Sequence, residues 1–473
     1  MKKSSRRSFL VETGKAASAT VLGSVLFNAK LALGATTYVR RNLAGMDASD
    51  PVLLSYRKAI AAMQALAQSN PLSWTYQGAI HWTTLTPLLT SWDNCEHGTE
   101  FFWSWHRMYL YWFERIVRKM CGDECWALPY WNWAPGSDLH LPAPFRDPAS
   151  ELYTVNRNAA MNSGAGALNA ALVSVGNSTT GSFGLTDFFS TNLNIQGPHG
   201  SVHTGTGGWM ASVPTAAQDP VFYVHHSNVD RLWDLWLAQG GGRSDPVLNS
   251  AWTSKTYTFF DETGAAVNMN ACEILRAAQQ LNYVYEGEPP QVLSFCRRRP
   301  PFPWWEFVNE TLFVLPGPPV ELGGEAVTVP IELKELVGKI RPVLESKKDT
   351  LLLDLDGVEA DEPPGVGWAV YAGLPAGTEA GVDSPYYLGS LSLFGVGIRS
   401  EKHHEFKPAH FVYALNRAVE AAMKANQERL PLTFVPLGIV VDGRATRPEV
   451  KAKVRIGKIS LVVQRATEER GEA

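Results

Sequence analysis

The sequence predicts a multidomain α+β chain, in which a mainly helical bundle is followed by a β-sandwich. Three observations support this fold class: a length of 473 residues exceeds one ordinary core, residues 101–120 contain no glycine or proline, and short apolar runs bounded by turns follow residue 326. Hydrophobic residues make up 45% of the chain and charged residues 19%, as is typical of a globular protein. The net charge of −4 gives no basic surface, so no nucleic-acid partner is expected.

The first residues are typical of an export signal. Arg6 and Arg7 precede Ser8-Phe9-Leu10 and then a weakly apolar stretch of small residues from Ala16 to Leu33. Such twin arginines predict a Tat signal over residues 1–35 and a periplasmic or secreted protein. Polar residues interrupt the apolar stretch, which is therefore too short for a membrane span, and we expect no stable membrane insertion.

Apolar residues at helical spacing predict three helices in the first part of the chain. They cover Val52 to Gln68, Glu100 to Met120, and a stretch within Pro214 to Gln239 that ends at three glycines. Small and polar residues between Asn156 and Gly184 predict loops instead. We therefore expect a helical bundle here.

Histidine spacing in this bundle points to metal ligands. His199 and His203 are four residues apart, so on a helix turning ~100° per residue they share one face and can bind one ion. His97 and His106 are nine apart, about 900° along a helix, and would lie on opposite sides of it. They can share an ion only if His97 lies in the turn-rich segment before the helix, Asp93 to Thr99.

With His81 and His226, these residues make six histidines in two groups of three. Imidazole is the usual ligand for copper, zinc, iron and nickel, and two facing groups suit two ions between helices. His226 lies four residues before Asp230, which places an acidic group beside a ligand on the same helix face. Four other histidines lie outside these motifs and are expected to have structural roles: His140, His403, His404 and His410.

These motifs resemble those of the type-3 copper proteins, the family of tyrosinases, catechol oxidases and hemocyanins. The resemblance runs from about Arg40 to Tyr285 and also includes Leu128-Pro129-Tyr130-Trp131-Asn132-Trp133 and the Asp219 to Arg231 segment. It implies a di-copper catalytic domain over residues 36–298, closed by Tyr283-Val284-Tyr285 with Arg40 or Arg41 as partner. The implied ligands are His81, His97 and His106 for one copper ion and His199, His203 and His226 for the other, with His225 a neighbour rather than a ligand.

Cys95 takes its meaning from the same resemblance. Cys95-Glu96-His97 is similar to the Cys-x-His of fungal tyrosinases, in which a thioether bond joins the cysteine to the histidine ring. Such a link would fix the ligand that the helix cannot position. Because export implies an oxidising compartment, the other cysteines can form disulfides, and the candidate pairs are Cys121 with Cys125 and Cys272 with Cys296.

The resemblance also bears on the substrate. Many members that hydroxylate monophenols carry a glutamate shortly before the first histidine of the second copper site and an asparagine directly after it. Here these positions are Gln196 (Ile195 in a register one earlier) and Gly200, and neither can act as a base. The gate position thirteen before His226, a phenylalanine in many plant catechol oxidases, is Val213, so an open passage is expected. The expected substrate-binding residues are Gln196, Gly200, Thr204, Met210 and Val213.

Two copper ions, with dioxygen as co-substrate, would allow such a site to oxidise small phenols. We expect oxidation of o-diphenols to o-quinones, with slow or absent hydroxylation of monophenols. The alternative is a hemocyanin-like protein that binds dioxygen without turnover, but the export signal and the single di-copper unit favour the enzyme. A hydrolytic two-metal site is disfavoured because such sites normally contain bridging carboxylates.

A proline-rich linker is predicted over residues 299–325 and a β-sandwich over residues 326–466, with Phe411 to Glu428 as its one helix. The strand-like runs lie within residues 326–331, 351–355, 367–371, 432–435 and 454–463. This region resembles the C-terminal domain of plant polyphenol oxidases, which implies a candidate lid. In related zymogens one side chain of this domain covers the copper site, and the expected blocker here is Tyr386, Tyr387 or Leu388. The alternative is that these residues pack inside the sandwich.

Overall fold

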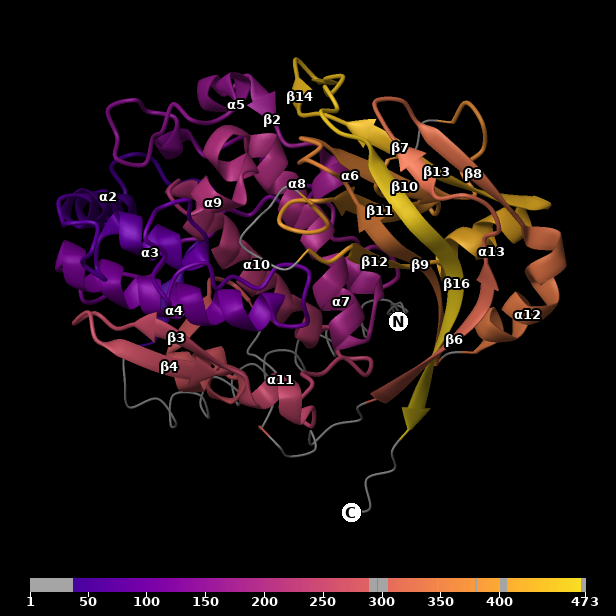
Figure 1. The fold of residues 1–473 in the computed structure, drawn as a ribbon, viewed down its shortest axis with the longest axis horizontal. Coiled ribbons are helices and arrows are strands. Elements are labelled where there is room, and N and C mark those ends of the chain that lie inside the picture. The colour runs from indigo at the N-terminus through magenta and orange to yellow at the C-terminus, as the bar shows by residue number, and fades with distance from the viewer. Residues whose placement is uncertain are drawn as a thin grey trace, which may run out of the picture.

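The chain forms two parts that lie against each other, a helical part and a part built of β-sheets (Figure 1). The structure, a computed structural model, describes residues 37–288, 296, 305–346, 348–378, 381–399 and 406–468. The export signal predicted for residues 1–35 lies outside these residues. Within them, no helix combines the length and the apolar character that crossing a bilayer requires.

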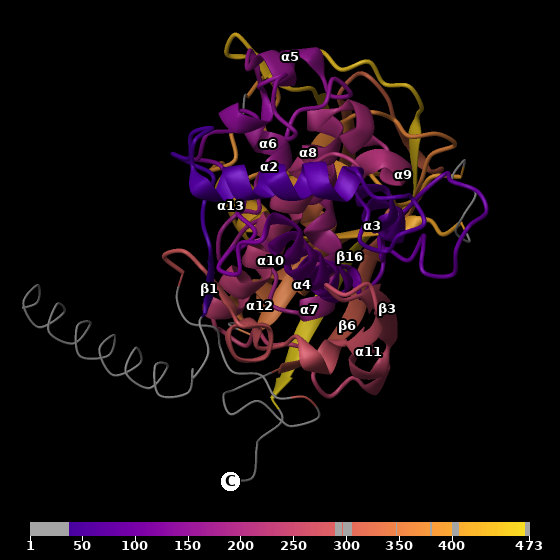
Figure 2. The same cartoon turned by 90° about the vertical axis from the view of Figure 1, so that its left-hand side faces the viewer.

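Five helices carry most of the first part. They are α2 (Pro51–Gln64), α3 (Trp74–His81), α4 (Phe102–Cys121), α8 (Gln196–Thr206) and α10 (Val221–Ala238). Local signals set their ends: Asp50 accepts the N–H of Val52 at the start of α2, and Gly122, with a φ of 71°, ends α4. The predicted helices are thus confirmed, although α2 ends at Gln64. Figure 2 looks onto this helical side, with α2 nearest the viewer.

Short elements complete the first part. They are β1 (Tyr38–Arg40), η1 (Ala143–Phe145), α5 (Ala159–Ser163), β2 (Gly166–Ala167), α6 (Ala170–Val173), η2 (Ser182–Gly184), α7 (Phe188–Asn194), η3 (Gly208–Ala211), α9 (Val213–Ala216), α11 (Ser250–Ser254), β3 (Thr256–Phe260), β4 (Ala266–Asn270), η4 (Ala271–Glu273), η5 (Ala277–Leu281) and β5 (Tyr283–Tyr285). The segment 156–184, predicted to be loops, therefore contains α5, β2, α6 and η2. Asparagine caps explain two of them, since Asn158 and Asn169 accept N–H groups at the starts of α5 and α6.

A buried ion network closes the first part at β1 and β5, which pair in parallel. Arg40 donates to the Tyr285 hydroxyl at 2.9 Å, to Asp230 at 3.1 Å and to Glu114 at 2.8 Å. Arg41 instead pairs with Asp50, where its own side chain is 42% exposed. Arg40 is therefore the partner of the tyrosine motif.

Two antiparallel sheets face each other in the second part. One has the order β12–β9–β16–β6, with β7 also paired to β16, and the other has the order β11–β10–β13–β8. Their bounds are β6 (Trp305–Val314), β7 (Val320–Leu322), β8 (Val327–Glu332), β9 (Asp349–Glu359), β10 (Gly367–Ala372), β11 (Tyr387–Ser392), β12 (Ala409–Ala414), β13 (Arg429–Leu437) and β16 (Val454–Glu468). Side chains from both sheets, such as Leu353 and Phe434, share one buried core. The predicted β-sandwich is confirmed.

Two predictions for this region are wrong. Residues 305–314, assigned to the linker 299–325, form β6, which pairs along nearly all of its own length with residues 460–468 of β16. Phe411 to Glu428 is not one helix: its aromatic and β-branched start belongs to β12, and α13 (Asn416–Lys424) follows. A second helix, α12 (Leu333–Glu345), contains Pro342, a residue that disfavours helix in sequence patterns.

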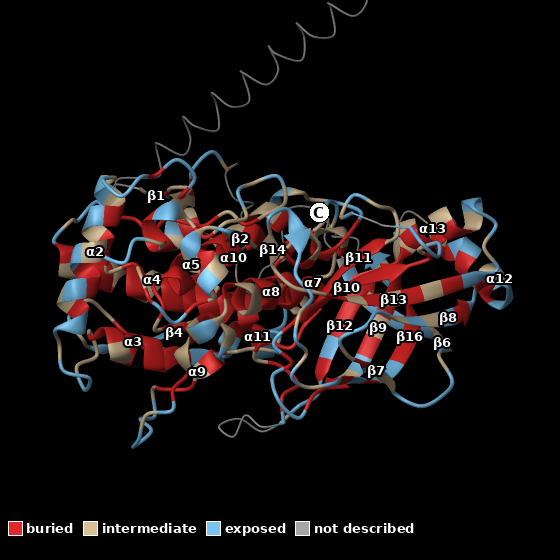
Figure 3. Cartoon of the chain, turned by 90° about the horizontal axis from the view of Figure 1, so that it is seen from above, coloured by how far each residue is buried: buried red, intermediate tan, exposed pale blue. Residues whose placement is uncertain are grey.

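The two parts meet where α8 lies against β11. Gly197 and Gly200 make this approach possible, because a Cβ atom at Gly197 would lie 2.3 Å from the Ser390 carbonyl oxygen and one at Gly200 would lie 2.7 Å from Ser392 Oγ. A second junction is formed by β14 (Val440–Val441), which pairs with β2 and with β15 (Arg444–Ala445). Buried residues, red in Figure 3, lie both in the helical part and in the two sheets.

One of the two candidate disulfides is present. Cys272 and Cys296 are bonded, which ties the chain at Cys296 back to the helical part. Cys121, buried at the end of α4, and the exposed Cys125 remain unbonded thiols. The sequence left these pairings open.

Candidate metal centre

The structure brings seven histidines into two adjacent clusters. His81 at the end of α3, His97 in the loop before α4 and His106 in α4 form one cluster. The second cluster comes from two helices and consists of His199, His203, His225 and His226. In each cluster the potential ligand atoms lie within 4.8 Å of one another. As the spacing predicts, His97 reaches its cluster from the loop.

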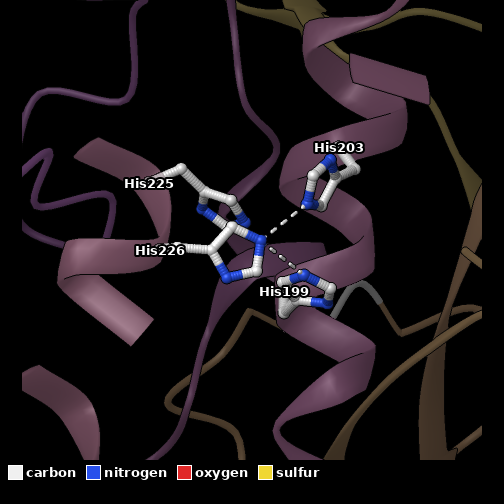
Figure 4. Close-up of side chains that lie close together, drawn as sticks. All are labelled: His199, His203, His225 and His226. Carbon is white, nitrogen blue, oxygen red and sulfur yellow. Dashed lines mark hydrogen bonds between the residues drawn. The ribbon is translucent and has the colours of Figure 1, made fainter. Parts of the chain in front are cut away.

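Three ring nitrogens converge in the second cluster (Figure 4). The Nε2 atom of His226 lies 3.4 Å from that of His199 and 3.3 Å from that of His203. His225 stacks beside His199, with ring centroids 5.2 Å apart. Converging nitrogen lone pairs in a buried place are the arrangement that a soft or borderline metal ion requires.

Backbone carbonyls orient one histidine of each cluster. The Phe102 carbonyl lies 2.7 Å from His106 Nδ1, and the Met210 carbonyl lies 2.8 Å from His203 Nδ1. Because a carbonyl oxygen only accepts, each Nδ1 carries the proton and each Nε2 presents its lone pair to the cluster. His106 Nε2 is buried and has no hydrogen-bond partner within the described part of the chain.

Burial keeps these imidazoles neutral. It lowers the pKa of His106 and of His203 to about 3, although the carbonyl hydrogen bonds oppose the shift. Burial also lowers the pKa of His199 and His226 well below the usual value, and the neighbouring histidines add to the effect. Neutral imidazoles are the form that binds a metal ion.

The two clusters are close enough to act on one small molecule. The rings of His106 and His226 stack with centroids 4.3 Å apart, and those of His97 and His199 lie 5.7 Å apart. Each cluster contributes at least three imidazoles, so the donor set fits two copper ions side by side. His81, His97 and His106 would hold one ion, and His199, His203 and His226 the other.

Cys95 lies beside the ring of His97. Its Sγ atom is 3.4 Å from His97 Nδ1, and the cysteine is 8% exposed. The loop between them is anchored through Glu96, which accepts hydrogen bonds from Lys255 and Tyr257. The predicted thioether pair is therefore in contact.

Asp230 has a different role from the one its spacing suggests. Its carboxylate accepts from Arg107, from Arg40 and from the Tyr283 and Tyr285 hydroxyls. Burial alone would raise its pKa, but Arg107 and Arg40 outweigh burial and hold the pKa below the usual range. Within the described residues no hydrogen bond joins it to a histidine, so Asp230 fixes α10 against α4 and β5.

The predicted substrate-binding residues are spread around α8. Gln196 is buried and its side chain accepts the N–H of Gly98 at 2.7 Å, while Gly200 faces β11. Thr204 lines a cavity between α8 and the C-terminal part, rather than the histidine clusters. Met210 contributes its carbonyl to His203, and Val213 is buried in α9.

Tyr387 and Leu388 do not cover the histidines but pack with residues of the sandwich, which is the alternative that the sequence left open. The Tyr387 hydroxyl donates to the Ala171 carbonyl, and Leu388 belongs to the sandwich core. β11 ends at Ser392, and the loop that follows places Phe394 on His203, with ring centroids 3.8 Å apart and planes 8° from parallel. Tyr387 and Leu388 are the first residues of β11 and Tyr386 directly precedes it, whereas Phe394 follows the end of the strand.

The glycine that follows Phe394 is a sequence feature that could have indicated a close approach of this loop to the site. Gly395 has a φ of 71°, and a Cβ atom there would lie 2.7 Å from His97 Nδ1. The Phe394-Gly395-Val396-Gly397 stretch thus combines an aromatic ring with a backbone that can approach a ligand closely. The same loop borders a cavity of about 320 Å³ that also contains Cys95 and His97.

Comparisons with known proteins agree with this site. The model of the common central domain of tyrosinase matches residues 71–165 and 154–239. A tyrosinase from Hahella sp., HcTyr1, is 35% identical over 54% of this chain and 64% of its own length. A latent polyphenol oxidase of Prunus armeniaca is 30% identical over 52% of this chain and 48% of its own length. The chain thus spans about half to two thirds of these curated relatives.

The fold is shared over both parts. A recombinant latent aurone synthase, a polyphenol oxidase, superposes on 92% of this chain and 90% of its own, with a TM-score of 0.65 and 21% sequence identity. The similarity covers the C-terminal sandwich as well as the helical part. At this level of identity it bears on the fold.

Proposed function

We propose that the protein is a copper-dependent polyphenol oxidase that converts o-diphenols to o-quinones with dioxygen, because the model of the common central domain of tyrosinase matches residues 71–165 and 154–239. The observation that carries the proposal is the convergence of buried, neutral imidazoles from four helices and one loop into two adjacent clusters. The enzyme class follows from the tyrosinases and polyphenol oxidases among its relatives.

The chain's own residues would prepare the reaction in two ways. The histidines hold two copper ions, which when bound supply the exchange of electrons between the phenol and dioxygen. Each o-diphenol gives up two electrons and two protons, so two diphenols reduce one dioxygen to two waters. The aromatic walls formed by Phe222 and Phe102 pack against His226 and His106 and exclude water from the ligands.

The C-terminal part would act as a lid. Phe394 occupies the face of His203 and is 5% exposed, and its ring lies 5.8 Å from that of His199. A phenol that approached the same histidines would need this space. We infer that the full chain is a latent form whose activity rises when the loop that carries Phe394 withdraws.

The preference for o-diphenols rests on Gln196 and Gly200. Neither residue can accept a proton from a monophenol, and the amide oxygen of Gln196 already binds Gly98. An o-diphenol loses its protons more readily. The ratio of tyrosine hydroxylation to catechol oxidation tests this preference, and a wild type that hydroxylates tyrosine as fast as it oxidises catechol would contradict it.

We further propose export by the Tat route to the periplasm or the medium. The support is the pair Arg6–Arg7 and the apolar stretch that follows, in residues 1–35. Fusion of these residues to a reporter, with Arg6→Lys and Arg7→Lys as the control, measures the export. Equal export by both forms would contradict it.

The function is tested by copper content and by oxygen uptake with catechol. We expect two copper ions per wild-type chain, and about one in His106→Ala and in His203→Ala, with oxygen uptake lowered at least about 10²-fold in both. His140→Ala, at a half-exposed histidine outside the clusters, is the control and should match the wild type. Full activity in both cluster variants would end the assignment, and reversible oxygen binding without quinone would favour an oxygen carrier.

A further inference from the structure

Side chains from another part of the chain bind the backbone of the segment that links His97 to His106. It begins at Gly98 and leads into α4, which starts at Phe102. The residue at the N-cap of this helix is Phe101, and its side chain makes no capping hydrogen bond. The first N–H groups of a helix need acceptors from elsewhere when they are buried. Asn192 in α7 supplies one, since its Oδ1 accepts the Trp103 N–H at 3.0 Å. Its Nδ2 donates to the Thr99 carbonyl at 2.8 Å.

Gln196 continues this support one helical turn later. Its Oε1 accepts the N–H of Gly98 at 2.7 Å, and its Nε2 donates to the Asn192 carbonyl at 3.2 Å. Both side chains are buried, with Asn192 fully inaccessible and Gln196 3% exposed. A buried amide whose two ends are both bonded is fixed in place, because leaving either group without a partner costs about 1–3 kcal/mol.

The bonded positions connect the two histidine clusters. Gly98 follows His97 directly, whereas Gln196 lies three residues before His199 in α8, the helix that also carries His203. The rings of His97 and His199 lie 5.7 Å apart. One side chain thus joins the loop of the first cluster to the helix of the second.

We propose that Gln196 and Asn192 are positioning residues that set the separation and orientation of the two copper sites. The inference rests on the proposed copper function. It gives Gln196 a role other than proton transfer: the side chain holds the loop ligand His97, which no helix supports, while Asn192 holds the first turn of α4 and through it His106. Loss of this bridge is expected to loosen one copper ion and to leave the other bound.

Copper retention tests the proposal without an activity assay. Gln196→Met keeps the size of the side chain and removes both polar groups, whereas Gln196→Glu keeps an acceptor for Gly98. The matched control is Asn194→Ala, because Asn194 is also a buried amide of α7 but bonds Ser182 and Val412 instead of the 98–103 segment. The copper-loaded full-length proteins are incubated with EDTA, and remaining copper is measured over time beside the electron paramagnetic resonance spectrum.

We expect Gln196→Met to lose its first copper ion about 10-fold faster than the wild type, as is usual when a group that orients a ligand is removed. The loss should produce the resonance of a single, uncoupled Cu²⁺ ion. Asn194→Ala should retain both ions like the wild type. Gln196→Glu keeps the acceptor for Gly98 and loses the donor to Asn192, so it should lose its first ion more slowly than Gln196→Met.

Equal copper loss by Gln196→Met and the wild type would overturn the inference, and so would equally fast loss by Asn194→Ala. Should Gln196→Met fail to fold, Asn192→Asp replaces it: this variant keeps the acceptor for Trp103, loses the donor to Thr99, and is expected to lose its first copper ion faster. Unchanged retention in that variant would also overturn the inference. A wild type that binds no copper would instead refute the proposed function itself.

Discussion

Phe394 and His203 stack face to face across the boundary between the two parts of the chain, with ring centroids 3.8 Å apart. Such a pair contributes about 0.5–1.5 kcal/mol beyond its buried area. The contact therefore covers the metal centre without holding the parts together by itself. The packing of β11 on α8 and the pairing of β14 with β2 provide the rest.

Removal of the Phe394 ring should expose the site. In Phe394→Ala we expect catechol turnover to rise severalfold while copper content stays at the wild-type level, because the variant changes access and no ligand. Oxygen uptake at equal copper measures this. Tyr387→Phe, which loses the hydroxyl that bonds the Ala171 carbonyl and does not touch the histidines, should behave as the wild type. Unchanged turnover in Phe394→Ala would show that the ring does not limit access.

A methyl group at Gly200, on α8, should push the loop that carries Phe394 away from the histidines. Its Cβ would lie 2.7 Å from Ser392 Oγ and 3.0 Å from Phe394 Cβ, closer than packed atoms allow. Gly200→Ala should therefore raise catechol turnover in the full chain. Gly338→Ala is the matched control, since nothing lies within 4 Å of a Cβ atom there. If both variants have wild-type turnover, the β11 contact does not govern latency.

Cys95 and His97 should be found covalently joined in the copper-loaded protein. The sulfur lies 3.4 Å from His97 Nδ1, and a bond between the sulfur and a ring carbon would remove two hydrogens. Peptide mass mapping should show the linked pair lighter by about 2 Da, with copper and dioxygen as the oxidising system. The metal-free protein should keep a thiol that alkylating reagents modify. An alkylatable Cys95 in active enzyme would contradict the link.

Asp230→Asn should destabilise the helical part by about 3–5 kcal/mol, because Arg40 and Arg107 would each lose one buried counter-charge and keep only Glu114 and Asp234. The native pKa of Asp230 lies below its unfolded value of about 3.9. Its contribution is thus fully present above that value and is lost as the pH falls through the native pKa.

Urea unfolding of wild type and variant measures this difference in stability. The gap should be constant from about pH 5 to 8 and should narrow below about pH 4. Asp442→Asn, at an exposed carboxylate between β14 and β15, should leave stability unchanged. A gap that widened towards low pH would contradict the sign of the shift.

The histidine clusters were predictable because helical periodicity fixes which residues share a face, and because His97 could reach His106 only from a loop. Phe394 was not predictable in the same way. Its position depends on how the sandwich docks, and in the sequence only Gly395 distinguishes this buried loop from an ordinary surface turn. Asp230 shows the same limit of sequence reasoning. It does lie four residues after His226 on α10, but its hydrogen-bond partners come from β1, α4 and β5, which the spacing could not reveal.

The strand pairing between β14 and β2 has a consequence for proteolytic activation. A cut between Cys296 and Trp305 would leave Cys296 bonded to Cys272 and would separate the backbones of the two parts. The backbone hydrogen bonds between β14 and β2 and the packing of β11 on α8 would remain. In the uncut chain the C-terminal part covers the histidine clusters as an intramolecular contact, with an effective concentration of about millimolar. In the cut protein the same contact would be a binding equilibrium between two separate chains. If the C-terminal part is the lid proposed above, the cut enzyme would stay inactive at high protein concentration and become active on dilution.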